Sequence, residues 1–190
     1  MSIVNSIIKL FVGDKQQKDL KSLQPVVDKV KSFENALTNL SNDELREKTI
    51  SFKSKIQEAT QTFTDEIAKL EAEIKTAEID IQEKLYAEID GLKDQAYDAS
   101  EKVLEEIMPE AFAVVKETAR RFATNEKLEV TATPFDRELS GIHEHVELDD
   151  DKAYWYNSWD ASGKEVTWDM IHYDVQLIGG SVLHLSLIHI

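Results

Sequence analysis

The sequence predicts a mostly α-helical protein with a small antiparallel β insertion and a long coiled-coil-like helical arm. Apolar residues recur at spacings of three, four and seven through most of residues 1–122, where glycine and proline are rare. After Phe122, β-branched and aromatic residues are mixed with turn signals and dense acid. A length of 190 residues allows one domain with a core, or a small domain plus an extended element.

The charge of the chain argues against nucleic acid as a partner. The formal net charge is −15 at pH 7. Because nucleic-acid phosphates are bound by clustered Lys and Arg, we expect no nucleic-acid partner. The chain has no cysteine, which excludes a disulfide framework and cysteine zinc sites and fits a cytosolic protein.

Residues 1–50 are predicted to form helices that precede the arm. Ile3, Ile7 and Phe11 share one face of a short amphipathic helix that should stop at Gly13. Two interpretations of this helix stay open: packing on its own domain, or docking on a membrane surface or a partner. It does not resemble a signal peptide, because its apolar residues are spaced and no basic region precedes them. No run approaches the roughly 18 to 20 apolar residues of a membrane span.

Two further helix signals follow in the same region. A helix is expected from Asp19 to Leu40, and Pro25 inside it should either kink the helix or mark a late start. The next helix should begin at Ser41, because Ser41 and Glu44 have the spacing of a capping box. In that motif the hydroxyl accepts the amide of Glu44, and the carboxylate accepts the amide of the cap.

Residues 51–106 are predicted to form the helical arm. Apolar residues between Phe52 and Leu92 follow a heptad-like pattern, with charged residues and glutamine between them. The pattern fits one long helix or a helical hairpin that can pair as a coiled coil. A structural spacer is the favoured interpretation, and a partner-binding arm is the alternative.

Two different segments follow the arm. Residues 107–126 are expected to restart a compact helix, with Pro109 in its first turn. Residues 127–168 are expected to form an acidic β insertion of two to four antiparallel strands. Within it, the sequence DASGKE at 160–165 predicts a hairpin turn. The aromatic residues of the insertion should supply its core.

The β insertion contains two weak candidates for a metal site. His143 and His145 alternate, so on a strand both imidazoles would point the same way, but no third ligand is evident and a solvated strand face is favoured. The three aspartates at 149–151 lack the alternating ligands and the glycine of a calcium loop, and they predict a solvated turn. The sequence has no recognisable nucleophile, histidine and acid arrangement. We therefore expect no catalytic residue and no metal ligand set in these 190 residues.

Residues 169–184, which begin DMIHYDVQLIGG, carry the most particular chemistry. The carboxamide of Gln176 presents one donor and one acceptor in a planar fork that matches N6 and N7 of adenine. Tyr173 and Met170 would hold the base by apolar contact. From the residues alone, adenine recognition stays a minority hypothesis for this segment.

Four segments of the chain, in order, resemble the bacterial SecA protein-translocase family. They are IIKLFVGDKQQKDLKSLQPVVDKVKSFE, LSNDELREKT, IMPEAFAVVKETARR and DMIHYDVQLIGGSVLH. The resemblance implies the N-terminal part of a P-loop, RecA-like α/β motor domain that ends before the Walker A phosphate loop. It also implies that Gln176 contacts the adenine of ATP with support from Met170 and Tyr173, a position where the family more often has phenylalanine. The arm and the β insertion fall between the matching segments, and we interpret them as lineage insertions.

The resemblance sets expectations for the intact protein. It should hydrolyse ATP with magnesium and push preproteins through the SecYEG channel. It should be cytoplasmic and peripheral on the inner face of the cell membrane, with an anionic membrane surface and a second copy of itself as further partners. The 190 residues alone should be inactive and bind ATP weakly, because no Gly-Lys-Thr phosphate loop occurs in them.

The last six residues of the chain do not share the resemblance. Residues 185–190, LSLIHI, differ from the family and match a translated sequencing adapter, so we expect a non-native tail. The alternative function is a non-enzymatic coiled-coil interaction protein that acts through the arm.

Overall fold

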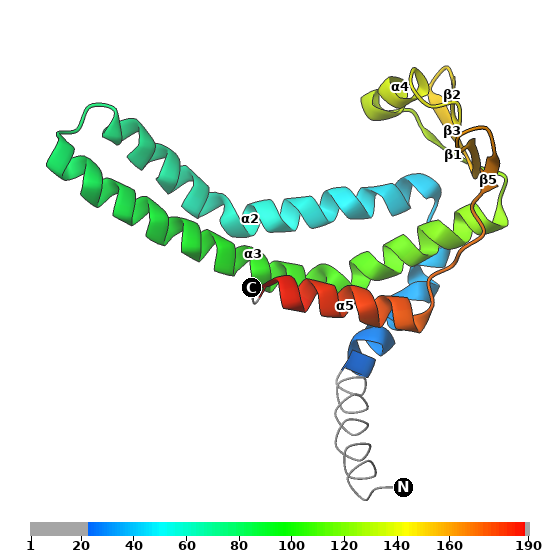
Figure 1. The fold of residues 1–190 in the computed structure, drawn as a ribbon, viewed down its shortest axis with the longest axis horizontal. Coiled ribbons are helices and arrows are strands. Elements are labelled where there is room, and N and C mark those ends of the chain that lie inside the picture. Colours follow the sequence, from blue (N-terminus) through cyan, green and yellow to red (C-terminus); the bar gives the residue numbers. More distant parts are fainter. Residues whose placement is uncertain (1–22, 189–190) are drawn as a thin grey trace, which may run out of the picture. The chain divides into compact units, whose positions relative to one another are not determined.

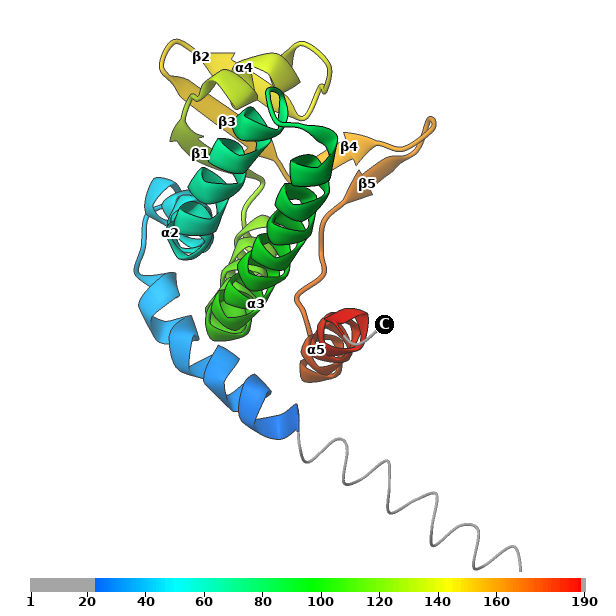
Figure 2. The same cartoon turned by 90° about the vertical axis from the view of Figure 1, so that its left-hand side faces the viewer.

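The structure is a computed structural model that describes residues 23–188, with side chains described for residues 23–184. The described residues form two compact units: residues 23–45 with 112–188, and residues 46–111. The elements appear along the chain in Figure 1 and, turned by 90°, in Figure 2. The amphipathic helix predicted at Ile3–Phe11 lies outside the described residues. The division of the chain into six segments stays a prediction.

Residues 23–38 are helical, as expected for the region from Asp19 to Leu40. Three apolar positions of this region are buried, with Val27 and Val30 fully covered and Leu37 nearly so, whereas Leu23, Phe33 and Leu40 are half-buried. Pro25 lies within the helical residues. The sequence left open whether Pro25 kinks the helix or marks a late start. The residues before 23, where an earlier start would lie, are outside the described part of the chain.

Helix α2, Asn42–Ile74, begins where the capping box predicts. The amide of Glu44 donates to Ser41 Oγ at 3.2 Å, and the amide of Ser41 donates to Glu44 Oε2 at 2.7 Å. These hydrogen bonds from Ser41 hold the pKa of the Glu44 carboxyl below its usual value. The two bonds satisfy donors that the first helical turn would otherwise leave open.

The second unit, residues 46–111, is a helical hairpin, which is one of the two forms that the heptad pattern allows. Helix α2 is followed after a short turn by α3, Ile79–Thr124. Ile74, Leu85 and Ile89 form a buried apolar seam between the two helices, and Ile67, Leu70 and Ala77 pack against it. Gln82 Nε2 closes the turn by donating to the carbonyl oxygens of Ile74 and Ala77.

The predicted helix start at Pro109 is wrong, because Pro109 lies inside the continuous helix α3. Proline there removes one backbone hydrogen bond and disfavours the helix. Buried apolar positions nevertheless continue on both sides of it, with Ile107 before and Ala113 and Val114 after. Packing therefore outweighs the local preference. The chain passes from the second unit to the first two residues later, after Ala111.

The β element follows α3 and belongs to the first unit. A three-stranded antiparallel sheet has the order β1-β3-β2, and a separate two-stranded sheet joins β4 and β5. The elements are β1 Lys127–Thr131, α4 Pro134–Ser140, β2 Val146–Asp149, β3 Lys152–Tyr156, β4 Ser158–Asp160 and β5 Glu165–Thr167. The prediction of two to four strands missed one strand and the helix α4. The additional strand arises because the chain changes sheets at Asn157, so residues 152–160 form two strands, β3 and β4.

Both predicted turns of the β element are present. Ala161 donates its amide to Lys164 O at 2.8 Å, and Ser162 and Gly163 have φ angles of 59° and 85°. Positive φ at both central residues is the pattern of a two-residue hairpin turn that suits the twist of the strands. Asp150, with φ of 57°, turns the chain between β2 and β3. The aspartate cluster is therefore a turn, as expected.

One buried acid organises the interior of the β element. Asp136 has no exposed surface, and its carboxylate accepts from the amide and hydroxyl of Thr133 and, at 2.9 Å, from Trp155 Nε1. The Thr133 bonds form the capping box of α4. The Thr-Pro-x-x sequence could have revealed this helix, because threonine three residues before an acid, with proline at the first position, is a helix-start signal.

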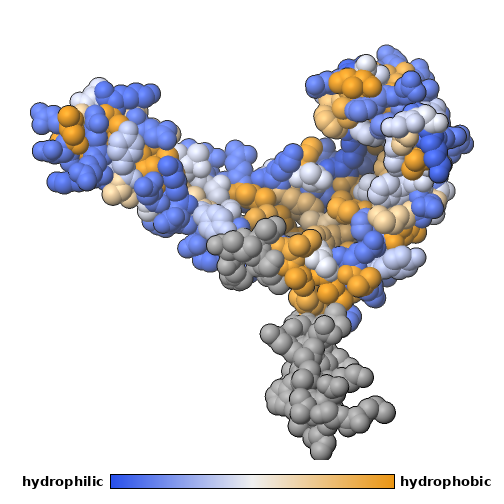
Figure 3. Space-filling model, viewed as in Figure 1, coloured by the Kyte–Doolittle hydropathy of each residue, from blue (hydrophilic) through white to orange (hydrophobic). Residues whose placement is uncertain are grey.

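Helix α5, Asp174–Ile188, packs on the part of α3 that belongs to the same unit. A Cβ atom placed on Gly180 would lie 3.2 Å from Phe112 Cζ, so glycine permits this close approach. Leu177 and Ser181 are buried on the same side. The opposite side exposes apolar residues, including Val175, Val182 and Leu183. Figure 3 shows where hydrophobic residues gather on the face of the molecule that it presents.

Candidate functional site

The structure brings the three predicted site residues together at the start of α5. Gln176 lies in the first turn of the helix, where its amide donates to Tyr173 O at 2.9 Å. Its side-chain Oε1 accepts from the amide of Tyr173 at 2.8 Å. Its Nε2 lies 3.7 Å from Met170 Sδ. A residue near the start of a helix can turn back to cap the amide before it, and this local rule places Gln176 beside its two neighbours.

The apolar residues of this group offer surface to a ligand. The side chain of Tyr173 is 73% exposed and that of Met170 is 37% exposed. A hydrogen bond of 2.8 Å from Trp168 Nε1 to Met170 O fixes the backbone that carries the thioether. The arrangement places an amide fork, a flat ring and a flexible thioether on one short exposed segment.

The first residue of α5, Asp174, forms an ion pair with the helix of residues 23–38. Lys31 Nζ and Asp174 Oδ2 are 2.6 Å apart. The hydrogen bond to Asp174 raises the pKa of the Lys31 ammonium above its usual value. An acid at this position also complements the positive end of the helix. The ion pair therefore helps to fix the start of α5 within the first unit.

A hollow of about 750 Å³ lies beside this segment. Its lining residues are Lys116, Asp169, Ile171, His172, Tyr173, Asp174 and Val175. Tyr173 is the one predicted site residue among them. Lys116 Nζ is held by Glu34 Oε1 at 2.6 Å, so its charge is already paired.

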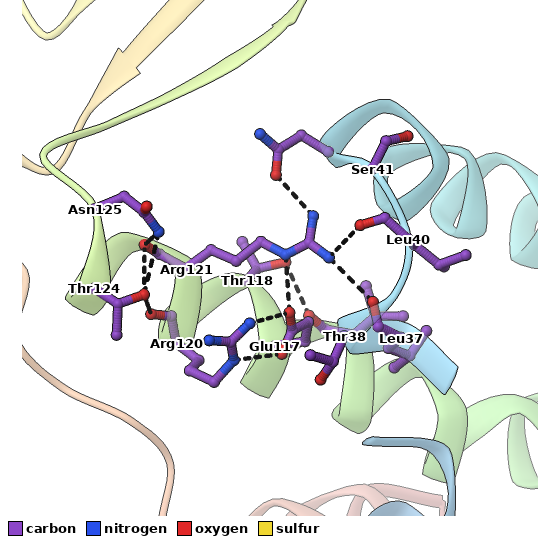
Figure 4. Close-up of polar contacts among 12 residues, drawn as sticks. Leu37, Thr38, Leu40, Ser41, Glu117, Thr118, Arg120, Arg121, Thr124 and Asn125 are labelled. Carbon is purple, nitrogen blue, oxygen red and sulfur yellow. Dashed lines mark hydrogen bonds and ion pairs between the residues drawn. The ribbon is translucent and has the colours of Figure 1, made fainter. Parts of the chain in front are cut away.

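A buried ionic cluster near the end of α3 was not predicted from the sequence (Figure 4). Arg121 is 7% exposed and Glu117 is 5% exposed. Arg121 donates to Glu117 Oε1 at 2.9 Å, to Leu37 O at 3.0 Å and to Leu40 O at 2.7 Å. A fourth bond joins Arg121 to Asn42 Oδ1 at 2.7 Å. One guanidinium thus satisfies carbonyls at the end of the helix of residues 23–38 and contacts the start of α2.

The charge state of Glu117 follows from this cluster. Burial alone would raise the pKa of its carboxyl, but hydrogen bonds from Arg120 and Arg121 outweigh that effect and hold the pKa below its usual value. Glu117 is therefore ionised at neutral pH. The i, i+4 spacing of Glu117 and Arg121 was the available sequence signal, although it is equally common on solvated helices. We assign this cluster a structural role.

The histidine pair does not lie on a strand, so that prediction is wrong. His143 and His145 precede β2 in a turn, although their ring centroids are only 5.3 Å apart. Burial, and then the charge of His143, lower the pKa of His145. Among the residues that the structure describes, no group of three metal-ligating side chains could hold a metal ion.

Comparison with known proteins gives the family. The SecA DEAD-like domain matches residues 8–189, which is nearly the whole chain. The chain belongs to the SecA family. It is 55% identical over 185 residues to the protein translocase subunit SecA of Flavobacterium psychrophilum and 54% identical to that of Christiangramia forsetii. The SecA of Porphyromonas gingivalis is 48% identical over 176 residues.

The alignments cover nearly all of this chain but only a small part of each SecA relative. The alignments include 97% of this chain for the first two proteins and 93% for the third, but only 16 to 17% of each relative. The chain therefore spans about one sixth of the length of the curated SecA proteins that it matches. No solved structure matches it. The interpretation as an unrelated coiled-coil interaction protein is not favoured, because the SecA match runs through the arm and the β element.

Proposed function

We propose that Gln176, Met170 and Tyr173 form the adenine-reading part of an ATP site in a protein translocase motor. The observation that carries the proposal is the contact geometry of Gln176. Its Oε1 accepts one bond from the amide of Tyr173, and its Nε2 makes one long contact with Met170 Sδ. The side chain is thereby held in one orientation by its own segment.

The held carboxamide keeps capacity for a base. A glutamine oxygen has two lone pairs and its nitrogen has two hydrogens, so one of each is left over after the two internal contacts. Adenine offers an N6 donor and an N7 acceptor at matching positions, whereas guanine offers two acceptors on that edge. The exposed ring of Tyr173 and the thioether of Met170 supply the apolar surface for the base. These features favour adenine over guanine.

The family supports the wider part of the proposal. We propose that the intact protein is a P-loop ATPase that uses magnesium and ATP to drive preproteins through the SecYEG channel. The 190 residues alone contain no Gly-x-x-x-x-Gly-Lys-[Ser/Thr] sequence. Because that loop holds the phosphates and magnesium in such motors, we propose that this chain binds ATP weakly and does not hydrolyse it.

The remaining proposals concern location and partners. We propose a cytoplasmic protein that binds peripherally to the inner face of the cell membrane through an anionic lipid surface, and that pairs with a second copy. Among residues 23–188, no helix has the length and apolar character needed to cross a bilayer. We propose that the hairpin of residues 46–111 acts as a coiled-coil-like spacer. Its apolar side is used in its own seam, which supports that role.

The adenine proposal can be tested by methionine methyl NMR on the 190-residue chain. The chain has three methionines, of which Met170 alone lies in the site. ATP should shift the Met170 methyl signal at high concentration, and GTP should shift it much less. Gln176→Glu removes the donor to N7 while keeping the shape of the side chain. The variant should lose at least about ten-fold in ATP affinity, within the range for one bidentate base contact.

The matched control is Gln95→Glu, which makes the same charge change on the exposed surface of the second unit. This variant should bind ATP as the unaltered chain does. AMP and adenosine should produce the same Met170 shift as ATP, because the proposed contacts involve the base. Equal shifts with ATP and GTP, or a Gln176→Glu variant with unchanged affinity, would contradict adenine reading.

A further inference from the structure

Asn157 joins the two ends of the β element to the end of α3. Its amide donates to Glu126 O at 2.9 Å, and its carbonyl accepts the amide of Trp168 at 2.7 Å. Its side-chain Nδ2 donates to Phe122 O at 3.1 Å. Residues 126 and 168 flank the β element in the sequence. One asparagine in the middle of this element therefore holds both of its ends together at the helix.

Trp168 extends these contacts to the adenine-reading segment. Its indole Nε1 donates to Met170 O at 2.8 Å, and Met170 Sδ is the atom that contacts Gln176 Nε2. Hydrogen bonds thus link Phe122 to Asn157, Asn157 to Trp168 and Trp168 to Met170. The thioether of Met170 in turn contacts the carboxamide of Gln176. All of these residues belong to the first unit.

We infer that Trp168 and Asn157 are positioning residues for adenine recognition, an inference that rests on the proposed function. The bonds of Asn157 and Trp168 hold the start of this segment close to the end of α3. Without them, α5 would still hold the C-terminal end of residues 169–173, but their N-terminal end would be held only through the strands, and Met170 would sample more positions. A base then has to order the segment on binding, which weakens affinity.

The matched pair of variants is Trp168→Phe and Trp155→Phe. Each deletes one indole N–H and keeps an aromatic ring. Trp168 Nε1 donates to Met170 O in the segment, whereas Trp155 Nε1 donates to Asp136 inside the β element. Asn157→Ala provides a second test, because it removes the bond to Phe122 and leaves the backbone bonds in place.

The first readout is amide hydrogen exchange of residues 169–177 without nucleotide. Trp168→Phe should speed exchange in this segment by about five-fold, the effect of losing one ordinary hydrogen bond, with the melting temperature nearly unchanged. Asn157→Ala should act in the same direction. Trp155→Phe should lower the melting temperature and leave the exchange of residues 169–177 as it was. Unchanged exchange in both Trp168→Phe and Asn157→Ala would overturn the inference.

The second readout is ATP affinity, which is measured from the Met170 methyl signal. Trp168→Phe should weaken ATP binding by about five-fold, and Trp155→Phe should not. Because exchange is measured without nucleotide, it tests positioning even where ATP fails to bind the unaltered chain. That failure would contradict the proposed function alone. Faster exchange with unchanged ATP affinity would contradict the positioning role alone.

Discussion

The two units of the chain are stabilised in different ways. The second unit is a helical hairpin with an apolar seam centred on Ile74, Leu85 and Ile89. Many of its side-chain hydrogen bonds are local, between residues four apart, such as Gln61 to Asp65. The first unit instead contains polar side chains that link residues far apart in sequence, with Arg121 contacting Leu37, Leu40 and Asn42.

This difference shows where single residues matter most. In the hairpin, many similar contacts share the stability, so no one residue decides the structure. In the first unit, a buried charge must be paired, and the groups that pair with it come from three separate segments. Loss of one such group removes hydrogen bonds from several buried groups at once. Substitutions in the two units should therefore differ in their effect on stability.

Arg121→Ala should have the largest effect. It leaves the buried carboxylate of Glu117 with one partner and removes the donors to Leu37 O and Leu40 O. We expect a loss of about 3–5 kcal/mol in the free energy of unfolding, measured by urea denaturation. Arg120→Ala is the control, because Arg120 also binds Glu117 but is 40% exposed, and its loss should cost at most about 1 kcal/mol. Similar losses for both variants would refute the contrast.

Ile89→Ala should have the next largest effect, in the hairpin. Ile89 is 2% exposed in the apolar seam, and its truncation should lower stability by about 2–3 kcal/mol, at the lower end for buried isoleucine because two helices can partly close the gap. Limited proteolysis should then cut residues 46–111 first. Ile81→Ala, at a 46% exposed position, should change stability by less than about 0.5 kcal/mol. If Ile89→Ala cost more than Arg121→Ala, the contrast would be reversed.

Asn42→Ala tests the link between helix and sheet. Asn42 Oδ1 accepts from Arg121, and its Nδ2 donates to Glu129 O at 2.9 Å on β1. Losing both bonds should cost about 1–2 kcal/mol in thermal or urea unfolding. Asn39→Ala removes one exposed local bond to Asn35 O and should be nearly neutral. Equal stability of the two variants would show that Asn42 does not join these elements.

The smallest effect should come from the pH dependence of His145. Burial lowers its folded-state pKa below the usual value of about 6.5, so the unfolded chain binds more protons near that pH. Stability should therefore fall as the pH drops through about 6.5 toward the folded-state pKa. Glu44 and Glu117 have lowered pKa values, so their contributions are lost only in more acidic solution. The urea midpoint of the His145→Gln variant should depend less on pH between about 7.5 and 5.5 than that of the unaltered chain. The same pH dependence in both would contradict the assignment.

The sequence predicted the features that depend on neighbours in the chain. The capping box at Ser41 and Glu44, the hairpin turn at Ser162 and Gly163 and the heptad arm are all local patterns with a known geometry. The grouping of Met170, Tyr173 and Gln176 also follows from a helix start, since seven residues cover it. Prediction failed at Pro109, where a local rule favoured a new helix but packing kept the old one.

The amino-acid sequence alone identified the family, the capping box, the hairpin turn and the three residues Met170, Tyr173 and Gln176 that meet at the start of α5. These features depend on periodicity, on turn residues and on motif spacing, which can be read directly from the sequence. Tertiary structure alone decided that Arg121 would close the end of a helix more than eighty residues away, and that Asn157 would hold the two ends of the β element. No short-range pattern specifies such contacts, because the partners meet only after the chain has folded and the free energy of burying them depends on all of them together.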